Sequence, residues 1–510
     1  MQWKNSRAIF NYKGVVALTT VSAFSKIASV LFKIIIIYII GTIGIGYYQL
    51  AFPLFVFSYT LSSVGNSTAL TMFVASGNEV KNRRVIRYAV AFSILIAGII
   101  ATFIVIFSKQ IALLQGNENL YIIYFGVALT IVSVSVLSVF RGAVRGYRLI
   151  TKYAVSDFIE QITKLILAVL FSYILLPYGL IYAVLGVFLG IFCSAIIASF
   201  YTIAVINNHE KKYTEQTSNF DTKKFWIFAI LASITSIILP LTQFIDSTLI
   251  VRLLEYIGYS HISATKLFGL SRGAVSSLIN LPNSAFLAID VLLLPDLVKL
   301  NPDEFVDKSK KIITITTFLV SLFCVTFLLF SNEILALVYG AKLDSTEFDL
   351  SCTLLKIGSL GIFFAGLSQI QSTILQGKKM LYLPIISLVV ASVSKLLFEI
   401  LIIPKLGIIG VELSNVLFYI ILSLLNSIFM CIKGMQFGSI KNLLSILIGS
   451  CVVVGIRLLY SLYAIKLNYI IAIIFAFLTI LVLIFTIYVS IIAVKKIKTN
   501  NNLKHWIILR

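Results

Sequence analysis

Ionisable side chains at helical spacing inside apolar segments are the residues of this sequence that could do chemistry. In the stretch "FRGAVRGYRLITKYAVSDFIEQITKLILAVLF", Asp157, Glu160 and Lys164 follow one another at intervals of three and four residues. This spacing places all three on one face of a helix and gives Glu160 and Lys164 the separation of a same-helix ion pair. We expect the three to form a charge network facing a wet interior. A pair that only fixes helix packing is the competing interpretation.

Several bases have no acid on their own predicted helix. Lys26 and Lys33 lie seven residues apart in the first apolar segment, and Lys266 and Arg272 lie in the outward half of the eighth. Lys33 and Lys266 could extend to the membrane surface, whereas Lys26 and Arg272 are expected deeper. We expect Lys26 and Arg272 to line a polar cavity, with ion pairs to acids of neighbouring helices as the alternative.

The remaining acids of the apolar segments are expected near helix ends, where water and headgroups are within reach: Asp246, Asp290 and Glu412, together with Asp157. Each buried charge costs about 2.5–3.5 kcal/mol at a helix centre, so charges deeper than this should face the protein interior or water. An excess of bases in a wet cleft attracts anions, and arginine supplies a forked donor that suits phosphate. The pattern therefore favours a phosphate or diphosphate group as ligand.

The elements that must position these charges are membrane-spanning helices. Hydrophobic residues make up 59% of the 510 residues, charged residues make up 12%, and the mean hydropathy is +1.03. A helix needs about 20 residues to cross a bilayer, and the sequence predicts 14 such spans in an all-α polytopic membrane protein. The first, about 15–40, is too long for a cleavable signal. The span centres are Ala28, Phe57, Ile96, Val132, Ile166, Val187, Leu239, Leu278, Phe323, Phe364, Val390, Tyr419, Gly455 and Leu481.

The distribution of positive charge predicts topology. Although the formal net charge is +21, 28 of the Lys and Arg residues fall in alternate loops and only 5 fall in the opposite loops. This is the positive-inside pattern, so we expect both termini in the cytoplasm and membrane lipids, not nucleic acid, as the contact of the basic surface. The 5 scattered cysteines indicate neither disulfides nor a metal site. Since no nucleotide-binding or metalloprotease motif occurs, we expect a transporter without cofactor or metal, not an enzyme.

An internal repeat organises the chain. When the numbering is shifted by 231 residues, "RGYRLITKYAVSDFIEQITKLI" falls on "QGKKMLYLPIISLVVASVSKLL", so that Arg148 meets Lys379 and Lys164 meets Lys395. Glu399 lies four residues after Lys395 and is expected to pair with it. Both copies start in a basic cytoplasmic loop, which predicts a parallel repeat. The predicted domains are an N-lobe (1–207, spans 1–6), a linker (208–224), a C-lobe (225–433, spans 7–12), and a last part with spans 13–14 and a basic tail (434–510).

Helix breakers fall at broadly corresponding places in the two lobes. The second span contains Pro53 and then "SSVGNS" with Gly65, and the eighth contains "NLPNS" with Pro282. Proline removes a backbone donor and glycine loosens a helix, so these residues are candidate hinges. Static kinks that serve packing are the alternative.

Two stretches carry a resemblance to a known family: "FRGAVRGYRLITKYAVSDFIEQITKL" and "LFGLSRGAVSSLINLPNSAFLAIDVLLLPDL". With the parallel lobes and two extra C-terminal spans, the chain resembles the polysaccharide-transporter branch of the multidrug/oligosaccharidyl-lipid/polysaccharide (MOP) flippase superfamily. Within it, the chain is most similar to the stage V sporulation protein B group and its lipid II flippase relatives. The resemblance implies a MATE-like fold with a V-shaped cavity, in which bases of the first and eighth spans bind a headgroup diphosphate. Those positions correspond to Lys26, Lys33 and Arg272.

The expected function is therefore the export of an anionic, undecaprenyl-diphosphate-type saccharide across the bacterial cytoplasmic membrane by alternating access, for cell-wall or surface polysaccharide synthesis. The expected protein is a monomer, and glycosyltransferases or a polymerase of the same pathway are its candidate partners. Two alternatives stay open. One is a cation-coupled multidrug antiporter of the same fold, in which Asp157, Glu160 or Asp246 would titrate. The other is a non-transporting scaffold for envelope or spore assembly.

Overall fold

The computed structural model describes residues 12–76, 82–210, 222–283, 297, 300–340, 342–435 and 453–454. Within these ranges all regular secondary structure is helical, and ten helices are long and apolar enough to cross a membrane. The prediction of an all-α polytopic membrane protein is therefore confirmed. The two last predicted spans, centred on Gly455 and Leu481, and the acid Asp290 lie outside the described residues. The total of 14 spans stays a prediction.

The chain divides into two compact units, the first made of residues up to Leu278 with Ser392–Ser414 and the second of Ile279–Ala391 with the residues from Asn415 on. The first unit contains α1 (Tyr12–Tyr59), η1 (Thr60–Val64), α2 (Gly65–Ser76), α3 (Asn82–Ile106), α4 (Ser108–Leu114), η2 (Glu118–Leu120), α5 (Tyr121–Gly146), α6 (Ile150–Leu175), η3 (Leu176–Tyr178), α7 (Leu180–Glu210), α8 (Thr222–Tyr256), α9 (His261–Phe268) and η4 (Gly269–Val275). The second contains α11 (Pro302–Leu329), α12 (Ser331–Tyr339) and α13 (Ser345–Gly377). Two helices contribute residues to both units, α14 (Tyr382–Leu406) and α15 (Ile408–Ile432). The predicted lobe boundaries stay a prediction.

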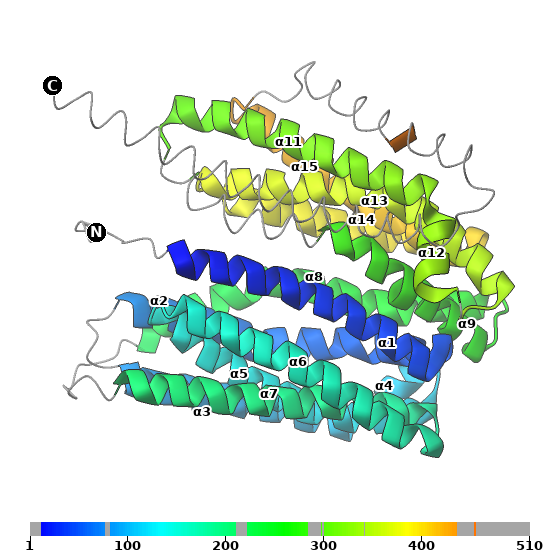
Figure 1. The fold of residues 1–510 in the computed structure, drawn as a ribbon, viewed down its shortest axis with the longest axis horizontal. Coiled ribbons are helices and arrows are strands. Elements are labelled where there is room, and N and C mark those ends of the chain that lie inside the picture. Colours follow the sequence, from blue (N-terminus) through cyan, green and yellow to red (C-terminus); the bar gives the residue numbers. More distant parts are fainter. Residues whose placement is uncertain are drawn as a thin grey trace. The chain divides into compact units, whose positions relative to one another are not determined.

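α1 consists of two antiparallel arms joined at Gly41. At about 1.5 Å per residue, a straight helix of 48 residues would be about 72 Å long, more than twice the thickness of the hydrocarbon core. Gly41 interrupts the helix with φ 68° and ψ −172°, a conformation that a side chain disfavours. Figure 1 shows α1 running away from the N-terminus and returning toward α2. The two arms are the first and second predicted spans, so the "GTIGIG" turn is reduced to its first glycine.

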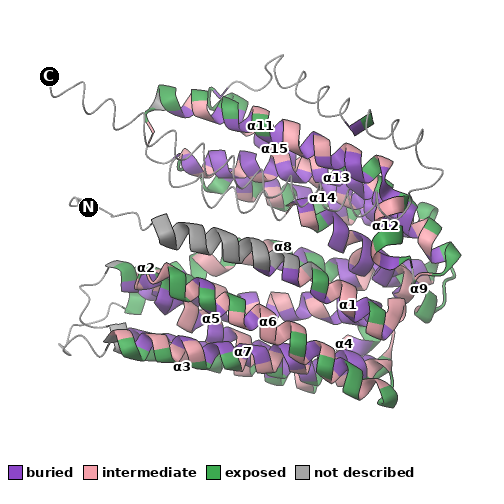
Figure 2. Ribbon diagram, viewed as in Figure 1, coloured by how far each residue is buried: buried purple, intermediate pink, exposed green. Residues whose placement is uncertain are grey.

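The outer surface of the helices is apolar, as a lipid-facing surface requires. On α3, Leu95, Ile99 and Phe103 are exposed at intervals of four residues, whereas Ala97 and Ala101 are buried. Figure 2 shows these exposed positions as one side of α3. In water such a stripe would be a large unfavourable patch. The stripe is explained by a helix that packs against the protein on one side and against lipid on the other.

Two π-helical segments lie in the second and eighth spans. η1 precedes Gly65 directly and overlaps the predicted "SSVGNS" breaker. η4 lies before the predicted "NLPNS" breaker, and Pro282 is a buried residue of the helical turn that follows. Pro53 lies inside the second arm of α1, where the helix continues through it. Single-turn π-segments occur frequently at functional sites. Whether Pro53, Gly65 and Pro282 act as hinges stays a prediction.

The helix–turn pairs of the proposed repeat correspond closely in length. α5 ends at Gly146 and α13 ends at Gly377, a separation that agrees with the predicted shift of 231. After the next helix, Gly179 precedes α7 and Gly407 precedes α15, and both have positive φ, 123° and 57°. Gly179 therefore corresponds to Gly407, three residues before Gly410, because the second copy reaches its turn earlier. The sequence match of Gly179 with Gly410 was wrong at this turn.

Candidate functional site

A cavity of about 600 Å³ lies within the first unit. It is bounded by both arms of α1, by η1 and α2, and by α5, α6 and α7. Aromatic rings form much of its lining, and polar groups are few and concentrated: Ser29, Phe32, Lys33, Tyr48, Phe52, Phe55, Val56, Tyr59, Val64, Ser67, Thr68, Val134, Leu137, Ser138, Arg141, Arg145, Tyr153, Glu160, Gln161, Lys164 and Ile191. This composition is typical of small-molecule sites, in which apolar walls carry a few convergent polar groups.

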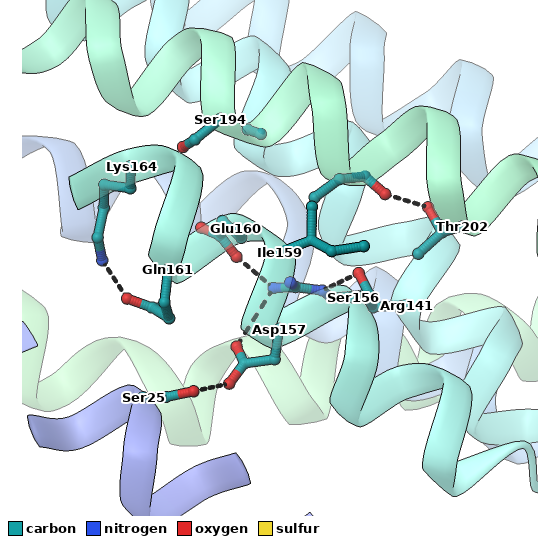
Figure 3. A network of polar contacts seen from close by, with 12 residues as sticks. Ser25, Arg141, Ser156, Asp157, Ile159, Glu160, Gln161, Lys164, Ser194 and Thr202 are labelled. Atoms are coloured by element: carbon teal, nitrogen blue, oxygen red, sulfur yellow. Dashed lines mark hydrogen bonds and ion pairs between the residues drawn. The ribbon is translucent and has the colours of Figure 1, made fainter. Parts of the chain in front are cut away.

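Arg141 organises the acids that border the cavity. Its Nη1 lies 2.5 Å from Glu160 Oε2 and 3.7 Å from Asp157 Oδ1, and its Nε donates to Ser156 Oγ at 3.0 Å. Asp157 Oδ2 in turn accepts a short hydrogen bond from Ser25 of α1. Figure 3 shows the guanidinium between these groups of α6. Both carboxylates are thus engaged by one cation, which leaves them little capacity to attract a second.

The Nη2 of Arg141 has no hydrogen-bond partner among the described residues, although the atom is buried. A buried, charged N–H group without a partner is costly, so such an atom in a cavity wall is suited to an acceptor from a ligand. The side chain is only 12% exposed and its planar fork is held by its other bonds. Arg141 therefore provides one oriented donor toward the cavity.

Two lysines bring like charges together in the same cavity. Lys33 comes from the first arm of α1, Lys164 comes from α6, and their ammonium groups are near enough to repel each other. Lys164 Nζ donates to Gln161 Oε1 at 2.5 Å and lies 5.7 Å from the ring centroid of Phe32. Among the described residues, no carboxylate oxygen lies within 4 Å of the Lys33 ammonium. An anion placed between the two lysines would relieve their repulsion.

Arg145 adds a fourth cation, one turn of α5 after Arg141. Its Nη2 donates to Ser67 Oγ at 3.1 Å, and the guanidinium lies 5.4 Å from the ring centroid of Tyr153. These contacts orient the side chain without neutralising its charge. The residues that line the cavity therefore include four bases, Lys33, Arg141, Arg145 and Lys164, and one carboxylate, Glu160. Low-dielectric walls strengthen the resulting attraction for anions.

A second group of charges lies in the same unit, away from the lining of this cavity. Asp246 of α8 contacts Lys395 through a short ion pair and Arg272 at 3.3 Å. Glu399 lies 3.6 Å from Lys395 and 3.7 Å from Arg272. The predicted pairing of Lys395 with Glu399 is confirmed. Two acids and two bases balance in this tetrad, and Gln49 of α1 donates to the Arg272 carbonyl oxygen at 2.7 Å.

Three expectations about these charges were wrong. Arg272 is not an uncompensated base, because Asp246 and Glu399 both pair with it. Asp246 is not at a solvated helix end, since it is 3% exposed and lies in the interior of α8. Glu160 pairs with Arg141 of the neighbouring helix, and the printed hydrogen bond of Lys164 goes to Gln161. In each case the partner comes from another helix or an uncharged neighbour, which same-helix spacing does not reveal.

The other predicted site residues are distributed between these regions. Lys33, Glu160 and Lys164 line the cavity, and Asp157 borders it through Arg141. Lys266 is a half-buried residue of α9. Lys26 belongs to the first arm of α1, but its side chain is not among those described. The binding roles predicted for Lys26 and Arg272 stay predictions.

Sequence reasoning missed Arg141 and Arg145. They were assigned to a basic cytoplasmic loop, whereas α5 continues through both and ends at Gly146. Their separation of four residues, within a helix that also contains Gly142, was the available signal, because it places both guanidinium groups on one helix face. Gly142 allows that face to approach α2: a Cβ at this position would lie 2.6 Å from the Ser67 carbonyl oxygen.

The chain is similar to several known proteins. Residues 12–292 match the family model described as polysaccharide biosynthesis protein. The stage V sporulation protein B of Bacillus subtilis is 22% identical over 296 residues, a match that spans 56% of this chain and 57% of that protein. The lipid II flippase MurJ of the same organism is 24% identical over 449 residues, 80% of each chain.

Two solved structures show the same fold. A lipid II flippase MurJ in an inward closed conformation superposes with a TM-score of 0.67 at 18% identity, over 94% of this chain and all of that one. An inward-facing MATE family transporter of the MOP superfamily has a TM-score of 0.60 at 12% identity, over 82% and 98% of the two chains. The expected MATE-like architecture is thereby confirmed.

Proposed function

Because this chain belongs to the polysaccharide biosynthesis protein family, we propose that it is a membrane flippase that moves an anionic, lipid-linked saccharide across the bacterial cytoplasmic membrane. The printed names of its relatives support a flippase rather than an enzyme. The MurJ relative acts on lipid II by its name, and we extend only the chemical class to this chain: a saccharide linked through phosphate to a lipid.

The observation that carries the proposal is the approach of Lys33 to Lys164 inside a cavity with a single lining carboxylate. Burying two ammonium groups near each other is unfavourable unless an anion accompanies them. A diphosphate carries charges that can satisfy both lysines, and Arg141 and Arg145 supply directional donors. Binding in the cavity would replace the water of the headgroup phosphates and so lower the barrier to crossing hydrocarbon.

The engagement of the acids weakens the antiporter alternative. A carrier of cationic drugs needs carboxylates that can accept a cation, yet Asp157 and Glu160 both contact Arg141. The balanced tetrad around Asp246 is likewise supplied with bases of its own. Export of a lipid-linked anion fits this charge distribution better than exchange of a cationic compound.

The experiment is transport by the purified protein in liposomes that contain a fluorescent polyprenyl-diphosphate saccharide. Lys33→Gln and Lys164→Gln should each lower the rate at least tenfold, because each removes a cation that the buried phosphate requires. Lys109→Gln is the matched control, since Lys109 lies on the exposed α4 in a 3.8 Å pair with Glu118. Unchanged transport in both cavity variants, with loss of drug efflux in Glu160→Gln, would instead establish the antiporter.

A further inference from the structure

One wall of the cavity is a row of aromatic rings. Tyr48, Phe52, Phe55 and Tyr59 follow one another on the second arm of α1 at intervals of four, three and four residues, so all face the same side. Successive ring centroids are 5.2, 5.8 and 6.1 Å apart. Four lining rings in sequence form a nearly continuous apolar surface. We call these four residues the aromatic row.

Two rings of this row are supported from behind. Phe188 of α7, which is fully buried and is not part of the cavity lining, packs against Tyr48 at 5.5 Å and Phe55 at 6.4 Å. Tyr48 and Phe55 are themselves 2% and 7% exposed. Phe52 and Tyr59 are half-buried and are therefore the members of the row that offer ring surface to the cavity.

Charged groups lie at both ends of the row. Tyr48 contacts Phe32 at 6.3 Å, and the Lys164 ammonium lies over that ring. At the other end, Tyr59 is within electrostatic range of Arg141. The 11 residues from Tyr48 to Tyr59 span about 16 Å of helix. A ligand that follows the row would therefore meet cations at its ends and rings between them.

Hydrogen-bonding groups face the row across the cavity. The lining includes the amide of Gln161, the carboxylate of Glu160 and the hydroxyls of Ser29 and Ser138. A pyranose has an apolar face of C–H groups with partial positive charge and a rim of hydroxyls. The C–H face complements the negative face of an aromatic ring, and the hydroxyls can bond to amide and carboxylate groups. An inorganic anion would use only the cations, and a polyprenyl tail would not use the polar groups.

We propose that Phe52 and Tyr59 are a stacking platform for a sugar ring of the transported headgroup, and that they thereby select a glycosylated lipid diphosphate over the bare one. This inference rests on the proposed function, because the cavity must hold the headgroup for the platform to act. The platform supplies discrimination for the sugar, whereas the four bases supply affinity for the phosphates. Phe52 and Tyr59 are thus specificity-determining residues of the cavity.

The test is equilibrium binding of two ligands to the full-length protein in nanodiscs: a polyprenyl diphosphate carrying one hexose, and the same polyprenyl diphosphate without sugar. Wild type should bind the glycosylated ligand more tightly. Phe52→Leu and Tyr59→Leu should each weaken its binding about five- to tenfold and leave the bare ligand within about twofold. Tyr59→Phe, which keeps the ring, should behave as wild type.

Phe57→Leu is the matched control, because Phe57 lies on the same arm, stacks on Phe244 at 6.1 Å and does not line the cavity. It should leave both affinities unchanged. Equal binding of the two ligands by wild type, or equal loss of both in the leucine variants, would overturn the platform while the phosphate site stands. If wild type bound neither ligand, the platform and the proposed function would both be overturned.

Discussion

Arg148 and Lys379, 231 residues apart, both adopt positive φ, 58° and 63°, and no other described non-glycine residue does so. Each follows the end of a helix and is enclosed by the same hydrogen bonds. Leu149 N donates to Val144 O at 3.1 Å in the first turn, and Met380 N donates to Leu375 O at 3.0 Å in the second. This bond pattern ends helices with a left-handed residue that is usually glycine. Two basic residues in one strained conformation support the predicted internal repeat.

The strain at these turns leads to a stability prediction. Arg148→Gly should raise the free energy of unfolding by up to about 1 kcal/mol, because glycine adopts the left-handed conformation without the steric cost of a side chain. Lys152→Gly, at an exposed position in the first turn of α6, should lower it by about 1 kcal/mol. Chemical denaturation in detergent measures both. A loss of stability in Arg148→Gly would show that the side chain itself holds the turn.

Arg141 should be the most sensitive charged residue of the cavity wall. Arg141→Gln leaves Glu160 and Asp157 without their shared cation, which should cost about 3–5 kcal/mol and lower the melting temperature markedly. The double variant Arg141→Gln/Glu160→Gln should recover part of this loss because one buried charge is removed with the other. Arg84→Gln, at an exposed position on α3, is the matched control and should be neutral. Equal melting temperatures for the single and double variants would contradict the pairing.

The tetrad of Asp246, Arg272, Lys395 and Glu399 should behave as one coupled unit. Lys395→Met leaves two buried carboxylates facing one arginine, so it should destabilise the protein by several kcal/mol. In a double-mutant cycle with Asp246→Asn, the coupling energy should reach about 0.5–3 kcal/mol. Lys356→Met on α13 is exposed and serves as the control. Additive losses in the cycle would mean that the tetrad contacts are not formed.

Close helix packing should make Gly46 intolerant of a side chain. A Cβ at Gly46 would lie 2.3 Å from the Thr265 carbonyl oxygen, so α1 and α9 would have to separate. Gly46→Ala should therefore lower the melting temperature clearly. Gly98→Ala is the matched control on α3, where a Cβ meets nothing within 4 Å, and it should be neutral or stabilising by up to about 1 kcal/mol. Differential scanning fluorimetry in detergent compares the two, and a neutral Gly46→Ala would refute the close crossing.

The sequence by itself determined the membrane class, the helical spans and the repeat. Hydrophobic length and composition decide these features, because a bilayer admits helices whose backbone groups are satisfied within one segment. The pairing of Lys395 with Glu399 also followed from spacing alone, since both lie on α14. Local periodicity carries this information without any knowledge of which helices are neighbours.

Only the tertiary structure decided which charges meet. Arg141 reaches Glu160 because α5 and α6 lie side by side, and Arg272 finds Asp246 because η4 packs near α8. The same packing brings Lys33 and Lys164, 131 residues apart, into one cavity. Ion pairing depends on separations of a few ångströms between helices, and the order of residues along one helix does not specify them. The sequence therefore indicates which charges are costly to bury, and the fold determines which of them face an open cavity.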